Sequence, residues 1–193
     1  MAAIHRERVL RAATSSFLAH GYGSSVDDIA RRAGVAKQTV YQHFANKDEL
    51  FKAVAGDLAK RVLVKLEGAG SKDEVRQSLL RFALAYRKRA LGAQGIATFR
   101  TLVPEVPRFR ALARAMYANT AGELVRRLAE YLGSAMGAGR LRRDDPEFAA
   151  EMLLSMLAGH DRLKRLFAVA PAAEADARRA ARIVDCFLRA YTS

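Results

Sequence analysis

Cysteine and proline are scarce in this sequence. Its 193 residues include one cysteine, Cys186, and four prolines. A lone cysteine cannot close a disulfide within the chain, and it cannot by itself build a cysteine-based zinc site. Runs of alternating β-branched residues are also missing, while 51% of the residues are hydrophobic. This composition favours an all-α globular protein with a sizeable core.

Long apolar runs are missing as well. No stretch approaches the length of a membrane-spanning helix. The first residues, MAAIHRERVLRAA, carry charges where a signal peptide needs its apolar segment. We therefore expect no membrane partner and a cytoplasmic location.

The motifs of common enzyme classes are not found in the sequence. There is no nucleophile elbow, no HExxH pair, no phosphate-cradling glycine loop and no cluster of histidines and cysteines with metal-ligand spacing. His160 and Asp161 are adjacent, but neighbouring residues on a helix point in different directions. We expect no catalytic residues, no metal site and no cofactor, and an all-helical enzyme stays as an alternative that no motif supports.

The most informative stretch runs from Ser25 to Leu50 and reads SVDDIARRAGVAKQTVYQHFANKDEL. Its pattern predicts two short helices separated by a tight turn at Gly34, followed by the start of a third helix. Glycine suits the turn because it adopts left-handed backbone angles at little cost. The Ser25 hydroxyl is placed to cap the first helix, and Asn46 is placed to cap the third.

The second short helix, from Ala36 to Phe44, carries the functional argument. Val40 and Phe44 are four residues apart and form one apolar stripe, whereas the other positions carry donors, acceptors and rings. A helix this short needs a fixed scaffold, so the apolar edge would anchor it while its other faces meet a DNA groove. Glutamine can pair with adenine and lysine with guanine, while tyrosine, histidine and lysine can reach phosphates. The candidate DNA-binding residues are Ser25, Lys37, Gln38, Thr39, Tyr41, Gln42, His43 and Lys47.

The segment DIARRAGVAKQTVYQHFANKDELF resembles the N-terminal helix-turn-helix domain of the TetR family of transcriptional regulators. Two positions depart from the family pattern, because Ala36 stands where serine is common and Gln38 where glycine is common. Ala36 removes an N-cap, which costs about 1 kcal/mol, and Gln38 adds a side chain that can contact a base. The resemblance implies a ligand-responsive regulator, most often a repressor, that binds a palindromic double-stranded DNA operator as a homodimer.

The rest of the chain predicts further helices. A connecting helix over residues 47–66 would join two domains. We expect residues 1–50 to form the helix-turn-helix DNA-binding domain and residues 51–193 to form a helical ligand-binding and dimerisation domain. Asp145 before Pro146 is a helix start signal. The other predicted helices span residues 4–20, where Phe17 is expected to be buried, and residues 72–91, 96–103, 107–136, 146–169 and 173–191.

Large side chains in the second half suggest two binding surfaces. The helix over residues 146–169 is apolar on more than one face, so we expect a second copy of the chain to cover one of them, with a wholly internal helix as the alternative. The candidate homodimer residues are Phe148, Met152, Leu153, Leu157, Ile183 and Phe187. The candidates for binding an apolar or aromatic small-molecule effector, each of which could instead be core, are Phe82, Tyr86, Phe99, Met116, Tyr117, Met152, Met156 and His160.

Two stretches, LVPEVPRFRALARAMY and GRLRRDDPEFAAEMLLSMLAG, resemble the AefR-like type of TetR ligand domain without indicating which ligand is bound. The formal net charge of +13 suggests a polyanionic partner. Residues 1–50, however, contain seven Lys and Arg against five Asp and Glu, a net of +2. The remaining charge either solvates a helical surface or strengthens non-specific attraction to DNA, so a sequence-independent, nucleoid-type DNA-binding protein stays as an alternative.

Overall fold

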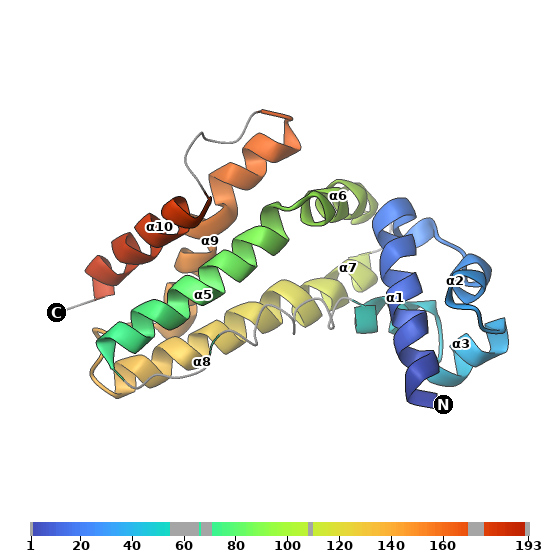
Figure 1. Ribbon diagram of the computed structural model, residues 1–193, viewed down its shortest axis with the longest axis horizontal. Helices are drawn as coiled ribbons and strands as arrows, with labels where there is room; N and C mark the ends of the chain where they lie inside the picture. The colour runs from blue at the N-terminus through green and yellow to red at the C-terminus, as the bar shows by residue number, and fades with distance from the viewer. Residues whose placement is uncertain (1, 55–65, 67–70, 108–109, 170–175, 192–193) are drawn as a thin grey trace. The chain divides into compact units, whose positions relative to one another are not determined.

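The computed structural model of the chain (Figure 1) describes residues 2–54, 66, 71–107, 110–169 and 176–191. Every regular element in these ranges is a helix and none is a strand, which confirms the all-α prediction. None of the helices in this part of the chain is long and apolar enough to cross a membrane.

The backbone contacts divide the chain into two compact units. Unit 1 contains residues 1–58 and 97–120, and unit 2 contains residues 59–96 and 121–193. A single boundary after residue 50 would place residues 97–120 with the second half, whereas the contacts group them with the first. The functional roles of the two expected domains stay predictions.

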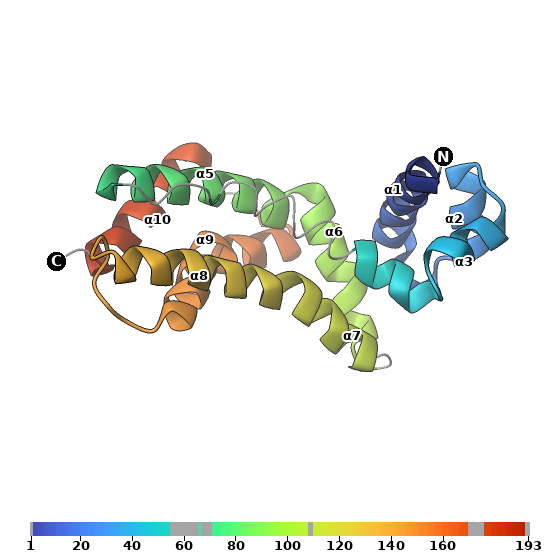
Figure 2. The same cartoon turned by 90° about the horizontal axis from the view of Figure 1, so that it is seen from below.

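Unit 1 begins with a small bundle in which α1 packs against both α2 and α3 (Figure 2). A short 3₁₀ helix, η1, follows α1. The predicted connecting helix begins at residue 47 as expected; its residues 55–65 lie outside the described residues, and Leu66 is not helical. The elements of this bundle are α1 (Ala2–His20), η1 (Gly21–Gly23), α2 (Val26–Ala33), α3 (Lys37–His43) and the helix described over residues 47–54.

The core of this bundle follows the apolar spacing of the sequence. Val9, Ala13 and Phe17 are four residues apart on α1, and all three are buried. Ile29 of α2 and Val40 of α3 belong to the same buried cluster. The shared core holds the seven-residue α3 on a scaffold that such a short helix could not provide for itself.

The segment after Gly92 differs in detail from the predicted helices. α6 (Ala93–Leu102) begins directly after Gly92, so Gly95 lies inside the helix instead of before it. A 3₁₀ turn, η2 (Val103–Glu105), ends this region. The predicted short helix therefore exists but starts three residues earlier.

The long helix predicted over residues 107–136 is interrupted. It consists of α7 (Arg110–Tyr117), a π-helical segment (Ala118–Gly122) and α8 (Glu123–Gly137). At the interruption, the Asn119 amide and the Thr120 hydroxyl donate to backbone carbonyls four residues earlier, each at 2.7 Å. The change of winding therefore coincides with two side-chain bonds to the helix backbone, a kind of bond that often bends helices.

Unit 2 is a helical bundle in which α5 packs against α9 and α10, and α8 packs against α9. Ser71 caps α5 in a capping box with Glu74. Asp145 caps α9 and Pro146 is its first residue, as predicted. The elements are α5 (Lys72–Leu91), α8, α9 (Pro146–Leu166) and α10 (Asp176–Tyr191). Fully buried core residues include Leu79, Phe82, Leu128, Leu132, Leu153, Leu157 and Phe187.

Candidate nucleic-acid interface

Gly34 fixes the turn between α2 and α3. Its φ is +63°, and its N–H donates to the carbonyls of Ala30 and Arg31. The N–H of Val35 donates to the same Ala30 carbonyl at 3.1 Å. At the other end of α2, the Ser25 hydroxyl oxygen accepts from the N–H of Asp28 at 3.0 Å. The left-handed turn and the cap are both confirmed.

α3 has one buried edge and several polar faces. Val40 is 1% exposed, and Phe44, which ends the helix, is 6% exposed. These two side chains therefore anchor α3 to the core of unit 1, as the apolar stripe predicts. Among the candidate residues, Lys37, Gln38, Tyr41 and Gln42 are exposed, while Thr39 and His43 are half-buried.

The N-termini of α3 and of the helix that begins at Lys47 are capped differently. Ala36 precedes α3 without a side-chain hydrogen bond, so the missing cap is confirmed. Asn46 Oδ1 accepts from the N–H of Glu49 at 2.9 Å, which caps the next helix as predicted. Lys47, the first residue of that helix, is half-buried.

Asp27 contacts the exposed lysine of α3. The Nζ of Lys37 lies 2.9 Å from Asp27 Oδ2, and both side chains are largely exposed. The hydrogen bond and the charge of Asp27 raise the pKa of Lys37 above its ordinary value. Lys37 is therefore a protonated donor that α2 already orients.

Two arginines of α1 contact the protein near α3. The Arg6 guanidinium lies 5.3 Å from the centre of the Phe44 ring, and Arg8 Nη2 donates to the Gly34 carbonyl at 3.4 Å. Both side chains thus contact the segment from Gly34 to Phe44, which contains α3. The sequence leaves open whether these arginines meet phosphates or only solvent, because their partners are far away along the chain.

Tyr22 of η1 contacts the helix that begins at Lys47. Lys47 Nζ lies 4.3 Å from the centre of the Tyr22 ring, and the Tyr22 hydroxyl donates to the Asp48 carboxylate. Burial, together with Asp48, raises the pKa of Tyr22 to about 12. Burial also lowers the pKa of Lys47. Only the position of Lys47 is predicted from the sequence; the contribution of Tyr22 is not.

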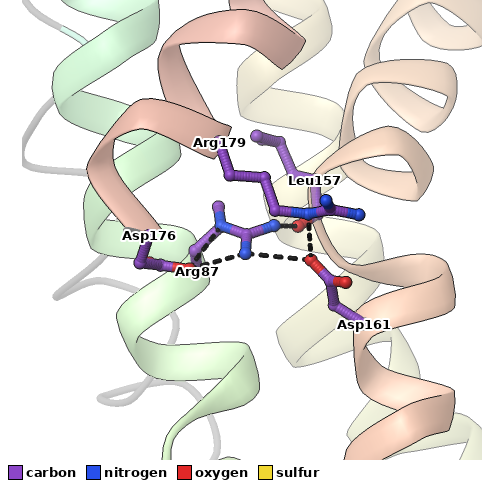
Figure 3. A network of polar contacts seen from close by, with 5 residues as sticks. All are labelled: Arg87, Leu157, Asp161, Asp176 and Arg179. Atoms are coloured by element: carbon purple, nitrogen blue, oxygen red, sulfur yellow. Dashed lines mark hydrogen bonds and ion pairs between the residues drawn. The ribbon is translucent and has the colours of Figure 1, made fainter. Parts of the chain in front are cut away.

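An ionic network centred on the buried Arg87 joins three helices of unit 2 (Figure 3). Arg87 of α5 is 2% exposed; its guanidinium donates to Asp161 of α9 at 3.0 Å and to Asp176 of α10 at 2.6 Å. It also donates to the Leu157 carbonyl, and Arg179 Nε donates to Asp161 at 2.7 Å. No local pattern in the sequence identifies this network, because Arg87 is 70 or more residues away from Leu157, Asp161 and Asp176.

The candidate effector-binding residues are distributed over both units. Phe82 is fully buried in the core of unit 2 and stacks on Tyr86, with 5.9 Å between ring centres. Met152 and Met156 pack against the same core, whereas Met116 packs against the core of unit 1. The remaining three candidates, Phe99, Tyr117 and His160, are exposed.

The candidate dimer residues also fall into two groups. Leu153, Leu157 and Phe187 are fully buried among the helices of unit 2. Phe148 is 57% exposed, while Met152 and Ile183 are half-buried. Further exposed apolar side chains at the other end of α9, which the candidate set omits, are Leu163 and Phe167. The interface itself stays a prediction.

Two known families match this chain. Residues 9–54 match the family described as bacterial regulatory proteins, tetR family. Residues 77–193, more than half of the chain, match the family described as AefR-like transcriptional repressor, C-terminal domain. The two matches cover the segments whose resemblance was stated from the sequence.

Curated relatives match over shorter stretches. The uncharacterized HTH-type transcriptional regulator YhgD of Bacillus subtilis is 38% identical over 65 residues, which are 33% of this chain and 34% of the relative. The HTH-type transcriptional activator FasR of Mycolicibacterium smegmatis is 48% identical over 50 residues, which are 25% of this chain and 23% of that protein. The matched stretches thus span about a third or less of each relative's length.

Solved structures match over nearly the full length. A TetR-family regulator from Mesorhizobium loti has a TM-score of 0.79 at 24% identity, with 100% of this chain and 99% of that chain covered. A TetR regulator from Agrobacterium tumefaciens has a TM-score of 0.79 at 22% identity, covering 96% and 94%. The flavonoid-responsive regulator FrrA has a TM-score of 0.75 at 29% identity, covering 97% of both. With both segments matched and the fold shared, this chain belongs to the TetR family of transcriptional regulators.

Proposed function

We propose that this regulator is a repressor that binds a palindromic operator as a homodimer and releases it when a small apolar or aromatic molecule binds. The observation that carries the proposal is the geometry of α3. Val40 and Phe44 fix the helix to its scaffold, while its lysine, tyrosine and glutamines stay exposed. Such a helix can enter the major groove without losing its own support.

The side chains of α3 suggest a division between base and phosphate contacts. Gln38 and Gln42 can pair with adenine through two hydrogen bonds, Lys37 can donate to guanine, and the Thr39 methyl can contact thymine. Base contacts of this kind specify sequence, whereas phosphate contacts position the protein. The residues proposed for phosphate contact are Ser25, Tyr41, His43 and Lys47.

A dimer and a repressing role are supported by different observations. A helix-turn-helix dimer reads two half-sites about 34–36 Å apart. The exposed Phe148 and Leu163 of α9, and Phe167 directly after it, offer apolar surface for a second copy. The repressing role is supported by the description of the family that residues 77–193 match. The activator FasR matches over 25% of this chain, which is weaker support for activation.

The proposal of an aromatic effector is supported by FrrA, whose name describes it as flavonoid-responsive. An effector releases DNA only as far as it prefers the non-binding conformation. A flavonoid panel in a thermal-shift assay is the direct test, and we expect at least one compound both to raise the melting temperature and to weaken binding to the operator. No stabilising compound in the panel would count against this part of the proposal.

Footprinting with DNA that flanks the protein's own gene tests the DNA-binding part. We expect a protected site with two-fold symmetry, and discrimination against unrelated duplex of about 4–10 kcal/mol. A nucleoid-type protein would instead bind all duplexes alike and lose nearly all affinity as salt is added. Uniform binding of that kind, or no protection at nanomolar protein in low salt, would contradict the proposal.

A further inference from the structure

Tyr22 stands between two oppositely charged side chains. The Lys47 ammonium lies over its ring at 4.3 Å, and its hydroxyl donates to the Asp48 carboxylate. Consecutive residues such as Lys47 and Asp48 do not face each other on a helix. One aromatic side chain therefore holds the cation on its face and the anion at its hydroxyl end.

The Tyr22 ring is itself held by other rings of the unit 1 core. Phe51 contacts it edge-on with 5.3 Å between ring centres, and Phe17 stacks on it at 6.5 Å. Both phenylalanines are buried. The core therefore sets the orientation of the ring, and Lys47 takes its position from the ring.

A lysine held in this way has fewer conformations to lose when it meets a phosphate. Ordering a long, flexible side chain on binding costs conformational entropy. The ring attracts and restricts the Lys47 ammonium before DNA arrives. The hydroxyl meanwhile engages Asp48, whose negative charge would repel a phosphate beside Lys47.

We infer that Tyr22 is a positioning residue for DNA binding: its ring presents the Lys47 ammonium to a backbone phosphate, and its hydroxyl draws Asp48 away from that phosphate. This role rests on the phosphate contact proposed for Lys47. The raised pKa of Tyr22, about 12, means that its hydroxyl keeps the proton it donates at neutral pH. Burial lowers the pKa of Lys47, while the charge of Asp48 opposes that shift.

Nuclear magnetic resonance of the free protein tests the geometry without DNA. The protons beside Lys47 Nζ lie over an aromatic face, so the ring current shifts their resonances upfield from those of Lys52, whose partner is Glu49. Tyr22→Phe keeps this shift, and Tyr22→Leu removes it. An unshifted Lys47 in the wild-type protein would overturn the inference.

Binding measurements test the consequence. Tyr22→Leu weakens binding to operator and to unrelated duplex alike, by about three- to fivefold, while Tyr22→Phe retains most of the affinity. Lys47→Ala also weakens binding to both, and adding Tyr22→Leu to it causes little further loss because the two residues act through one contact. Asp48→Asn in the Tyr22→Phe protein restores what Tyr22→Phe loses.

The variants separate failure of this inference from failure of the proposed function. Unchanged binding by Lys47→Ala would remove the proposed phosphate contact. If Lys47→Ala weakens binding but a folded Tyr22→Leu does not, the positioning role is wrong and the phosphate contact stands. The same conclusion follows if the affinity loss of the double variant equals the sum of the two single losses. Circular dichroism reports folding. If Tyr22→Leu does not fold, the Lys47 resonance in wild type and Tyr22→Phe, with the Asp48→Asn rescue, decides the outcome.

Discussion

Asp27 forms an ion pair with Lys37, the exposed lysine of α3. Its carboxylate lies 2.9 Å from Lys37 Nζ, and because solvent reaches both groups, water and salt screen their attraction. Binding to a phosphate or a guanine must therefore compete with Asp27. We expect this pair to weaken binding of Lys37 to an arbitrary duplex. It should weaken binding less at an operator whose acceptor lies where Asp27 already holds the Lys37 ammonium.

We predict that Asp27→Asn increases non-specific DNA binding. Released from Asp27, Lys37 gains a phosphate contact on any duplex, so the slope of log affinity against log salt steepens by about one unit. Fluorescence anisotropy between about 50 and 200 mM salt measures this slope. Glu49→Gln is the matched control, because it removes the same charge from the exposed Lys52 pair. An equal slope in wild type and Asp27→Asn would contradict the prediction.

Gln38 is the side chain that distinguishes this recognition helix from the usual family pattern. Replacing it with alanine should cost about 1–3 kcal/mol on the operator and relax the preference at one base pair, while unrelated duplex is bound as before. Affinities for operators substituted at each position measure this change. A uniform loss on all sequences would instead assign Gln38 to a phosphate.

Residue roles are predictable from the sequence where the partner is close along the chain. Ser25 caps through Asp28, and Asn46 caps through Glu49, three residues later in both cases. Tyr22 could not be identified in this way, because its partner Lys47 lies on another helix. Contacts of this kind depend on how η1 packs against the helix that begins at Lys47, and no local pattern encodes that packing.

The element that sets α3 against α2 is the left-handed turn at Gly34. We predict that Gly34→Ala lowers the free energy of unfolding by about 1–2 kcal/mol, because a Cβ is unfavourable at a φ of +63°. The new Cβ would also lie 2.5 Å from Arg8 Nη2, whose flexible side chain can move away. Urea unfolding measures the change.

Gly23→Ala is the control for this turn. Gly23 lies in the same unit, its φ is not in the left-handed region, and a Cβ there meets nothing within 4 Å. We expect its free energy of unfolding to differ little from wild type. Equal destabilisation by the two substitutions would show that backbone strain at Gly34 is not the cause.

Apolar periodicity finds helices more reliably than it finds their irregularities. It predicts α5 and the start of α9 at the residues observed, because their caps are local. It misses the π-helical segment Ala118–Gly122, since one extra residue in a turn barely alters an apolar stripe. The bonds that Asn119 and Thr120 make to the backbone become evident only in the structure.

At the scale of the whole molecule, we expect the Arg87 network to stabilise the packing of α5 against α9 and α10. Arg87→Met removes hydrogen bonds to Asp161, Asp176 and the Leu157 carbonyl and leaves Asp161 with Arg179, so it should lower the free energy of unfolding by about 2 kcal/mol. Arg76→Met is a matched control because Arg76 and Asp185 also join α5 to α10, with side chains 44% and 39% exposed. We expect less than about 1 kcal/mol there. Equal effects in urea unfolding would contradict a special role for burial.

The same network predicts a pH dependence. Burial raises the pKa of Asp161, but hydrogen bonds from Arg87 and Arg179 lower it further, so the folded-state pKa lies below the ordinary value. Such a carboxylate stabilises the fold above its unfolded-state pKa, and the contribution is lost as the pH falls through the folded-state pKa. The stability gap between wild type and Asp161→Asn should therefore shrink as the solution is acidified through the aspartate range. If urea unfolding gives the same stability difference between wild type and Asp161→Asn at every pH, the ionised Asp161 carboxylate is not its cause.

Assembly is the property that most depends on exposed residues of α9. If Phe148 and Leu163 meet a second copy of the chain, replacing both with glutamate buries uncompensated charge at the interface and separates the subunits. A monomer holds one half-site, so it loses the operator preference but keeps weak binding to any duplex. Analytical ultracentrifugation measures the mass, and Ile4→Glu, an equally polar change at an exposed site of α1, should leave a dimer. A doubly substituted protein that stays dimeric would place the interface on another surface.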